Sequence, residues 1–201
     1  MSEIFDIVDE NGMPTGETVE RSVAHHDGIL HRTAHVWIAR EVSQVVIDGK
    51  VYEGKNYQVL MQKRSMNKDS FPGQLDTSSA GHVHSGDEPL ESAIREVKEE
   101  LGLEIAPEEL QFAGTFRIDY KGEFHDEPFL DNEVAFMYVY FKDVDLKDIV
   151  VQPEEVESVE WVNVYDAYIG CMKQEEYCVP MQEMRLLSDF LLKNDKEWRS
   201  R

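Results

Sequence analysis

The pattern that most restricts this 201-residue chain is an amphipathic stretch near its middle, from Pro89 to Leu101. Proline suits the first turn of a helix, and Gly102 stands where a left-handed residue commonly ends one. The apolar residues of the stretch repeat at helical spacing and would line one face: Leu90, Ala93, Ile94, Val97 and Leu101. The pattern predicts a helix over 89–101 that packs this face against another layer of structure.

The opposite face of the same helix is acidic. Glu96, Glu99 and Glu100 are three or four residues apart, so their side chains project into one neighbourhood, where like charges repel. A divalent cation would relieve the repulsion, and carboxylate oxygens suit Mg²⁺ or Mn²⁺. The competing interpretation of such a cluster is a solvated charged face.

Strand patterns are found on both sides of the predicted helix. Alternating or β-branched runs predict strands at 31–40, 57–62, 111–118, 133–141 and 157–162, with a short hairpin beginning near residue 3. Asp48-Gly49 predicts a tight hairpin turn, and 180–193 predicts a C-terminal amphipathic helix. Strands mixed with a few helices indicate an α/β fold with helices on a mixed sheet, in a single domain over 1–201.

The charge balance limits the classes of partner. The chain has 41 acidic and 20 basic residues, a formal net charge of −21, which disfavours general nucleic-acid binding and anionic membranes. No apolar run approaches the roughly 20 residues needed to span a bilayer, and the N-terminus lacks the pattern of a signal peptide. Two cysteines are too few for a disulfide scaffold. We therefore expect a cytoplasmic protein.

A longer motif contains the acidic helix. From Gly81 to Leu103 the sequence reads G-x5-D-x7-R-E-V-K-E-E-L-G-L, which resembles the Nudix box, G-x5-E-x7-R-E-U-x-E-E-x-G-U, where U is a bulky aliphatic residue. Every fixed position matches except Asp87, where the family has glutamate. The resemblance implies a Nudix α/β/α sandwich with a mixed β-sheet and a loop–helix–loop catalytic motif.

The same resemblance implies which residues would act. Glu96, Glu99 and Glu100 would bind Mg²⁺ or Mn²⁺, helped by a backbone carbonyl near Ala80, and Arg95 would orient the motif. The bound ion would neutralise a diphosphate and activate water for attack on phosphorus. The expected activity is hydrolysis of a diphosphate bond in a small molecule, with a nucleoside diphosphate linked to another moiety as the leading candidate.

Shorter segments resemble a Nudix subgroup shared with isopentenyl-diphosphate isomerase. They are Leu30-His31-Arg32, Gln62-Lys63-Arg64 with Lys68, Phe71-Pro72-Gly73 and Asp131-Asn132-Glu133-Val134. This resemblance implies that Arg64 and Lys68 hold the diphosphate. In the isomerase, a histidine-rich metal site includes residues that match His31, His82 and Glu133. We interpret His26 and His35 as ordinary histidines, and whether His25 joins a second metal site is left open.

Two features favour hydrolysis over isomerisation. The isomerase requires a cysteine just before the box, where this chain has Ala80, and alanine cannot exchange a proton with an allylic carbon. The isomerase also has a degenerate box, whereas this chain keeps the full Arg-Glu-Val-Lys-Glu-Glu. The isomerase and a catalytically silent ligand-sensing module remain the alternatives.

Several roles stay open at this level. Glu96 and Glu133 are both candidates for the general base, and Glu133 could instead lie on an exposed strand face. The stretch 119–131 contains glycine and charges and is interpreted as a loop that influences substrate choice. The hairpin over 41–58 looks like an insertion relative to shorter family members, and it would serve as a homodimer contact or as part of the pocket wall.

Overall fold

A mixed β-sheet forms the centre of the protein in the computed structural model, which describes residues 3–124 and 127–194. Its strands run in the order β5-β4-β3-β8-β7, and β6 pairs with β3 while β9 pairs with β4. Strands β3 and β8 are parallel and the other pairs are antiparallel. The strands are β3 (His31–Ile47), β4 (Lys50–Arg64), β5 (Leu75–Asp76), β6 (Ser79–His82), β7 (Leu110–Phe124), β8 (Glu127–Phe141) and β9 (Val156–Asn163).

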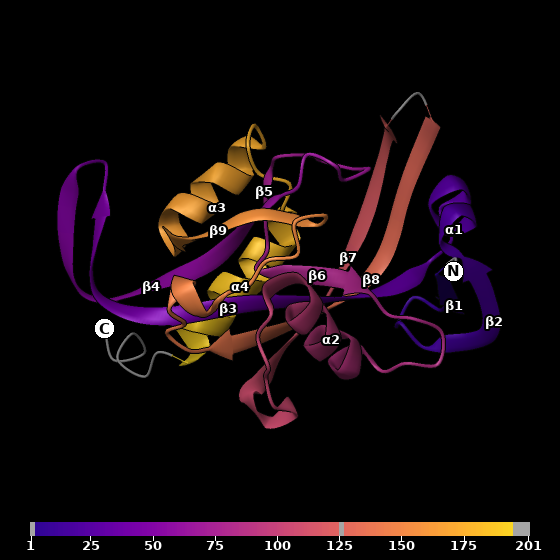
Figure 1. Cartoon of the computed structure of the whole chain (residues 1–201), viewed down its shortest axis with the longest axis horizontal. Coiled ribbons are helices and arrows are strands. Elements are labelled where there is room, and N and C mark those ends of the chain that lie inside the picture. Colours follow the sequence, from indigo (N-terminus) through magenta and orange to yellow (C-terminus); the bar gives the residue numbers. More distant parts are fainter. Residues whose placement is uncertain (1–2, 125–126, 195–201) are drawn as a thin grey trace.

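Helices cover both faces of this sheet (Figure 1). Helix α2 (Pro89–Leu101) packs on one face, where its apolar stripe meets Ala34, Val36 and Ile38 of β3. Helices α3 (Val164–Lys173) and α4 (Met181–Asn194) pack on the other, against Trp37 and Ala39 of the same strand. Successive β3 side chains alternate between the two cores, as the period of a strand requires. The predicted α/β/α sandwich is confirmed.

The N-terminal segment forms a small unit of its own beside the sheet. Strands β1 (Ile4–Val8) and β2 (Pro14–Glu20) make a separate two-stranded sheet, followed by the short helix α1 (Arg21–Asp27). The Asp6 carboxylate fastens this unit to the loop ahead of α2, because it accepts hydrogen bonds from Arg32 Nη2 (3.0 Å) and Ser85 Oγ (2.7 Å). The unit is thereby held against the start of the predicted catalytic motif.

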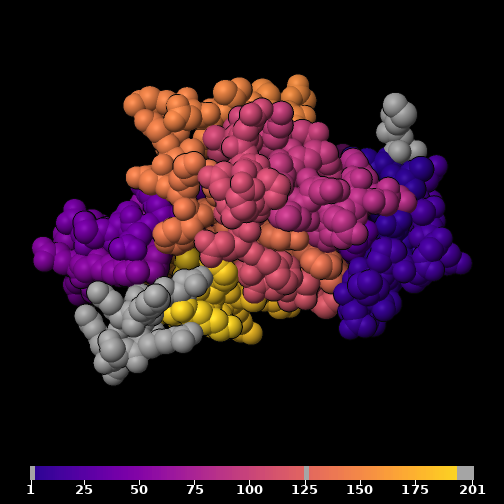
Figure 2. Space-filling model, turned by 90° about the horizontal axis from the view of Figure 1, so that it is seen from below, coloured from indigo at the N-terminus to yellow at the C-terminus, as the bar shows by residue number. Residues whose placement is uncertain are grey.

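Helix α2 agrees with its predicted bounds. It begins at Pro89 and ends at Leu101, and Gly102 follows with φ of 68°, donating its N–H to the Lys98 carbonyl. The β3–β4 hairpin also turns at Asp48 and Gly49, both at positive φ, as predicted. This hairpin lies at one end of the molecule and the N-terminal unit at the other (Figure 2).

Some expectations were wrong. The stretch 119–131 was predicted to be a loop, but its described residues, 119–124 and 127–131, form a strand pair, since β7 and β8 stay in register from Asp119↔Asn132 to Phe124↔Glu127. Its polar and aromatic residues alternate, and pairing with β8 outweighs the weak strand propensity of its glycine and charges. The short helices α1 and α3 were not predicted. The suggestion that 41–58 forms part of the pocket wall is also wrong, because the cavity that contains the predicted site residues is lined by other described residues.

A buried polar network ties α4 to β3. The Glu183 carboxylate is fully buried and accepts hydrogen bonds from Trp37 Nε1 (2.8 Å) and His35 Nδ1 (3.1 Å). Burial alone would lower the pKa of His35, but the adjacent carboxylate raises it overall.

The described residues include no helix with both the length and the apolar composition of a membrane span.

Candidate active site

One cavity of about 750 Å³ brings the predicted site residues together. Its lining includes every residue that the sequence analysis assigned to catalysis, metal binding or substrate binding: Arg64, Lys68, Ala80, Arg95, Glu96, Glu99, Glu100 and Glu133. These residues come from β4 and the loop after it, β6, α2 and β8. The fold therefore gathers at one place residues that are up to 69 positions apart, from Arg64 to Glu133 (133 − 64).

The acidic face of α2 lies directly against strand β6. Glu100 is buried, and its Oε2 accepts hydrogen bonds from the Ala80 N–H (3.2 Å) and from Gln62 Nε2 (3.3 Å). Glu96 lies against Gly81, where a Cβ atom would stand 2.0 Å from the Glu96 carboxyl carbon. The Glu99 side chain is 53% exposed at the rim. The three glutamates thus differ in depth, and the backbone of β6 completes their surroundings.

Burial changes the acidity of the two deeper glutamates. It raises the pKa of Glu96 to about 7, against the opposing effect of Arg95. It raises the pKa of Glu100 to about 8, and the nearby Glu96 carboxylate contributes to that rise. Near neutral pH these groups compete for protons, so a divalent cation bound between them would displace protons and remove the repulsion. Carboxylate oxygens backed by backbone amides fit a hard ion such as Mg²⁺ or Mn²⁺.

Arg95 ties the acidic face of α2 to strand β6. Its Nη2 donates to the His82 carbonyl (2.9 Å), and its Nη1 donates to Glu96 (2.7 Å) and Glu99 (3.2 Å). The backbone carbonyl of Asp87, in the loop before this helix, accepts a hydrogen bond from Arg32 Nη2 (3.0 Å). Arg95 therefore links Glu96 and Glu99 of α2 to the backbone of β6.

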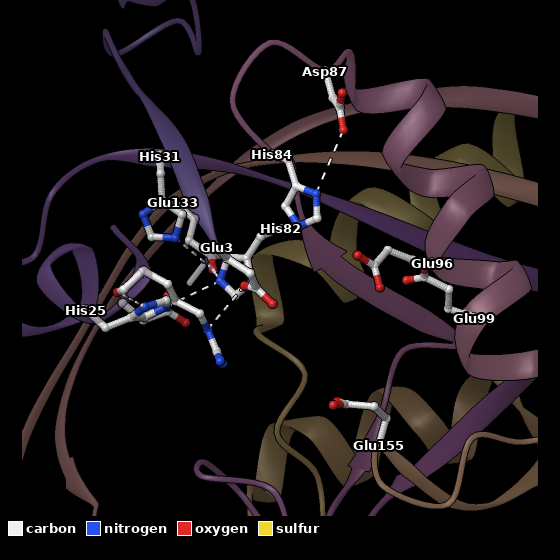
Figure 3. A network of polar contacts seen from close by, with 12 residues as sticks. Glu3, His25, His31, His82, His84, Asp87, Glu96, Glu99, Glu133 and Glu155 are labelled. Atoms are coloured by element: carbon white, nitrogen blue, oxygen red, sulfur yellow. Dashed lines mark hydrogen bonds and ion pairs between the residues drawn. The ribbon is translucent and has the colours of Figure 1, made fainter. Parts of the chain in front are cut away.

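The two cationic side chains that were predicted to hold the diphosphate both have acidic partners. Arg64 pairs with Asp76 at 2.8 Å and also donates to the Ser70 carbonyl. Lys68 pairs with Glu155, which belongs to the loop before β9. Figure 3 shows Glu155 on a separate segment from Glu96 and Glu99. Sequence reasoning missed Asp76 and Glu155, since neither lies in a recognisable motif, and a phosphate would have to compete with them.

A second polar group, the histidine cluster, occupies another part of the same cavity (Figure 3). It consists of His25, His31, His82 and Glu133, and each residue offers one ligand atom within 4.8 Å of the others. They come from α1, β3, β6 and β8. The open question about His25 is answered in part, because the fold places it in this cluster, while His26 is exposed and His35 faces Glu183.

The ring orientations in the histidine cluster leave lone pairs pointing inward. His25 Nδ1 and His31 Nδ1 lie 2.9 and 2.8 Å from the carbonyls of Arg21 and Ile29, so in the neutral ring each Nδ1–H donates and Nε2 carries the lone pair. His25 Nε2 lies 3.3 Å from His82 Nε2. His31 Nε2 is buried without a hydrogen-bond partner in the described part of the chain. Burial lowers the pKa of His31 to about 4 and lowers that of His82 well below its ordinary value. Neutral imidazoles of this kind are suited to bind a metal ion.

Glu133 belongs to the buried part of the site. It is 5% exposed, it accepts a hydrogen bond from Thr33 Oγ1 (2.8 Å), and its Oε1 lies 3.7 Å from His31 Nε2. Burial raises its pKa well above the ordinary value, and the Asp131 carboxylate adds to the rise. The interpretation of Glu133 as part of an exposed strand face is therefore wrong.

Comparison with known proteins identifies the family. The NUDIX domain family matches residues 39–180, more than half of the chain. The chain belongs to the Nudix hydrolase family. The family and the enzyme class expected from the box are thus confirmed for this Nudix enzyme.

The aligned region covers different shares of the length of the relatives of this Nudix enzyme. It is 36% identical over 176 residues to Nudix hydrolase 3 of Arabidopsis thaliana, covering 87% of this chain but 21% of that protein. It is 33% identical over 200 residues to an uncharacterised Nudix hydrolase of Clostridium acetobutylicum, covering 96% and 89% of the two chains. An isopentenyl-diphosphate Δ-isomerase of Streptomyces coelicolor is 29% identical over 164 residues, covering 80% and 71%.

Solved structures show the same fold at low sequence identity. A Deinococcus radiodurans protein superposes with a TM-score of 0.62 at 18% identity, covering 87% of this chain and 92% of that one. The NUDIX domain of Shewanella oneidensis NrtR, solved in complex with ADP ribose, superposes with a TM-score of 0.52 at 12% identity, covering 81% and 87%. These matches support the sandwich architecture of the Nudix enzyme.

Proposed function

We propose that this Nudix enzyme hydrolyses a diphosphate bond in a small molecule and uses Mg²⁺ or Mn²⁺ held by Glu96, Glu99 and Glu100. The observation that carries the proposal is that the half-buried Glu96 and the buried Glu100 lie side by side against β6, with their pKa values raised to about 7 and about 8. Buried carboxylates that repel each other are costly in a protein without a cation. The Ala80 carbonyl is the proposed additional ligand.

The remaining residues have supporting roles in this proposal. The bound ion would supply charge neutralisation and a more acidic water. Arg95 holds Glu96 and Glu99 in place, and Glu96 and Glu133 remain the two candidates for the general base. Arg64 and Lys68 would exchange Asp76 and Glu155 for substrate phosphates. The proposed substrate is a nucleoside diphosphate linked to another moiety, the type of compound bound by the Shewanella NUDIX domain.

A substrate screen tests the proposal. With Mg²⁺ present, the protein is incubated with nucleotide sugars, dinucleotides, coenzyme A and thiamine diphosphate, and phosphate-containing products are identified by mass spectrometry. We expect turnover of at least one compound, abolished by EDTA. Tight binding of one compound without any turnover would favour the ligand-sensing module. Solvent deuterium entering isopentenyl diphosphate, with no phosphate-containing product, would favour the isomerase, against which Ala80 argues.

We propose in addition that the histidine cluster holds a second divalent ion. Three imidazoles and one carboxylate form a donor set that suits Zn²⁺, Mn²⁺ or a similar ion. The carbonyls of Arg21 and Ile29 fix two of the rings from outside, which is how proteins commonly orient histidine ligands. The buried His31 Nε2, which has no hydrogen-bond partner among the described residues, is the strongest support, since an unsatisfied polar atom of this kind is otherwise destabilising.

This second ion can be counted directly. We expect His31→Asn to lose about one equivalent of tightly held metal, measured by elemental analysis after dialysis. The variant removes the buried Nε2 from the centre of the cluster. His26→Asn is the matched control, because His26 is an exposed histidine outside the cluster. Equal metal content in the wild type and His31→Asn would exclude a metal centre at these residues.

A further inference from the structure

Four aromatic side chains form a wall at the cavity. This aromatic wall consists of Phe71, Tyr120, Phe124 and Phe129, all half-buried. Ring centroids lie 5.0 Å apart for Phe71 and Tyr120, 5.2 Å for Phe71 and Phe124, and 5.3 Å for Phe124 and Phe129. Phe71 belongs to the loop after β4, and the other three to the β7–β8 pair. Phe71, Tyr120 and Phe129 line the cavity itself.

Packing of the protein core does not account for the aromatic wall. Its four residues lie outside the three clusters of buried apolar residues found in the described part of the chain. Half-buried aromatic rings leave part of their apolar faces in contact with solvent, which is unfavourable unless another group covers them. The stability of the fold therefore does not explain the position of the aromatic wall.

Two backbone features hold the rings where they are. Phe71 has φ of 49°, a left-handed conformation that is unfavourable for a residue with a side chain. At Gly122, a Cβ atom would stand 2.4 Å from the Tyr120 hydroxyl oxygen, so the glycine makes room for the Tyr120 ring to lie over its own strand. Unfavourable conformations that persist in proteins tend to occur where a ligand is bound.

The aromatic wall is continuous with the proposed catalytic region. Phe129 stacks on His25 of the histidine cluster, with centroids 4.9 Å apart and an angle of 18° between the rings. The same cavity extends from these rings to Glu96 and Glu100. A group attached to a diphosphate at the glutamates would therefore share one cavity with the aromatic wall.

We propose that the aromatic wall is a subsite for the base of a nucleotide substrate, stacked on Tyr120 and Phe71. This inference rests on the proposed function and specifies its substrate class. The neighbouring lining residues Asn67, Asp69 and Asp119 are polar, so they suit the hydrogen-bonding edge of a planar base better than an isoprenoid chain, which needs apolar cover on all sides. Stacking on aromatic faces tolerates any base, so the wall sets the class of substrate and leaves the individual base open.

Binding of two non-hydrolysable probes tests this subsite. The probes are α,β-methylene-ADP and methylenediphosphonate, which share the diphosphate analogue and differ by the nucleoside, and calorimetry is performed with Mg²⁺ present. We expect the wild type to bind α,β-methylene-ADP at least tenfold more tightly than methylenediphosphonate. Tyr120→Ala and Phe71→Leu should each weaken the binding of α,β-methylene-ADP about tenfold and leave the affinity for methylenediphosphonate within twofold of the wild-type value.

Phe112→Ala is the matched control, because Phe112 is a 55% exposed aromatic residue on the same strand β7, outside the cavity lining. Phe71→Leu retains apolar volume, so it also guards against a folding defect in Tyr120→Ala. Equal affinity of the wild type for both probes, or equal losses for both probes in the variants, would overturn the subsite.

The outcome is separable from that of the substrate screen. A selective loss of affinity for α,β-methylene-ADP in the variants would uphold the subsite even if no diphosphate were hydrolysed. Hydrolysis of diphosphates, with no selective loss of affinity for α,β-methylene-ADP in the variants, would overturn the subsite and leave the hydrolase proposal standing.

Discussion

Glu100→Gln is expected to lower turnover of any diphosphate substrate by at least about 100-fold while the fold stays intact. Glutamine keeps a carbonyl oxygen that can accept from the Ala80 N–H, but it removes the deepest anionic ligand of the proposed metal site. Steady-state kinetics with Mg²⁺ measures the loss, and thermal unfolding in EDTA measures the stability of the metal-free protein.

The same substitution has an expected dependence on pH. The folded-state pKa of Glu100, about 8, lies above its ordinary value of 4.5, so ionisation favours the unfolded chain. The loss of folding stability that this ionisation causes in the metal-free wild type is absent below pH 4.5 and grows until the pH passes about 8. Glutamine has no such cost, so Glu100→Gln should gain stability relative to the wild type as the pH rises from 5 to 8 in EDTA.

Glu91→Gln is the matched control, since Glu91 is an exposed glutamate on the same helix outside the cavity lining. It should retain wild-type turnover and the wild-type dependence of stability on pH. Near-normal turnover in Glu100→Gln would remove this residue from the metal site. A melting temperature in EDTA far below that of the wild type would contradict the burial of a proton-bearing carboxyl.

Gly81→Ala should reduce turnover by a factor of about 10 to 100 and weaken Mn²⁺ binding. The new Cβ atom would stand 2.0 Å from the Glu96 carboxyl carbon and 2.2 Å from its Oε1, so the carboxylate must move away from its position. The backbone at Gly81 is outside the positive-φ region that disfavours alanine, so the collision with Glu96 is the main consequence. Kinetics and calorimetric titration with Mn²⁺ measure the two effects.

A double-mutant cycle isolates this collision. In a Glu96→Ala background the carboxylate is absent, so adding Gly81→Ala should cost little further activity or metal affinity. Independent, multiplicative losses from the two substitutions would show that Gly81 acts on something other than Glu96.

The sequence predicted the parts of the site that local patterns encode. Helix α2 was predicted to its end residues because helical spacing, Pro89 and Gly102 all act within a few positions. The resemblance to the family added Arg64, Lys68 and Glu133 as site residues, and the fold places all three at the cavity. Their roles in binding and catalysis stay predictions.

Long-range pairing accounts for what was missed. The partners Asp76 and Glu155 are 12 and 87 residues from the cations they neutralise, and their own segments carry no motif. The place of His25 depends on the short helix α1, which is too brief to show a periodic pattern. The aromatic face of 119–124 was hidden because its glycine and charges suggested a loop, whereas pairing with β8 makes it a strand.

The origin of the histidine cluster has a consequence for the order of folding. His25 and His82 are 57 residues apart in the chain. Thr33, at the edge of the cluster, donates a hydrogen bond to Glu133, which is 100 residues away. Closing such loops is entropically unfavourable and slow compared with forming local structure. The cluster is therefore complete only after the N-terminal unit has docked on a finished sheet. An ion captured there during refolding would mark the end of the process, and its uptake would report native topology as a whole.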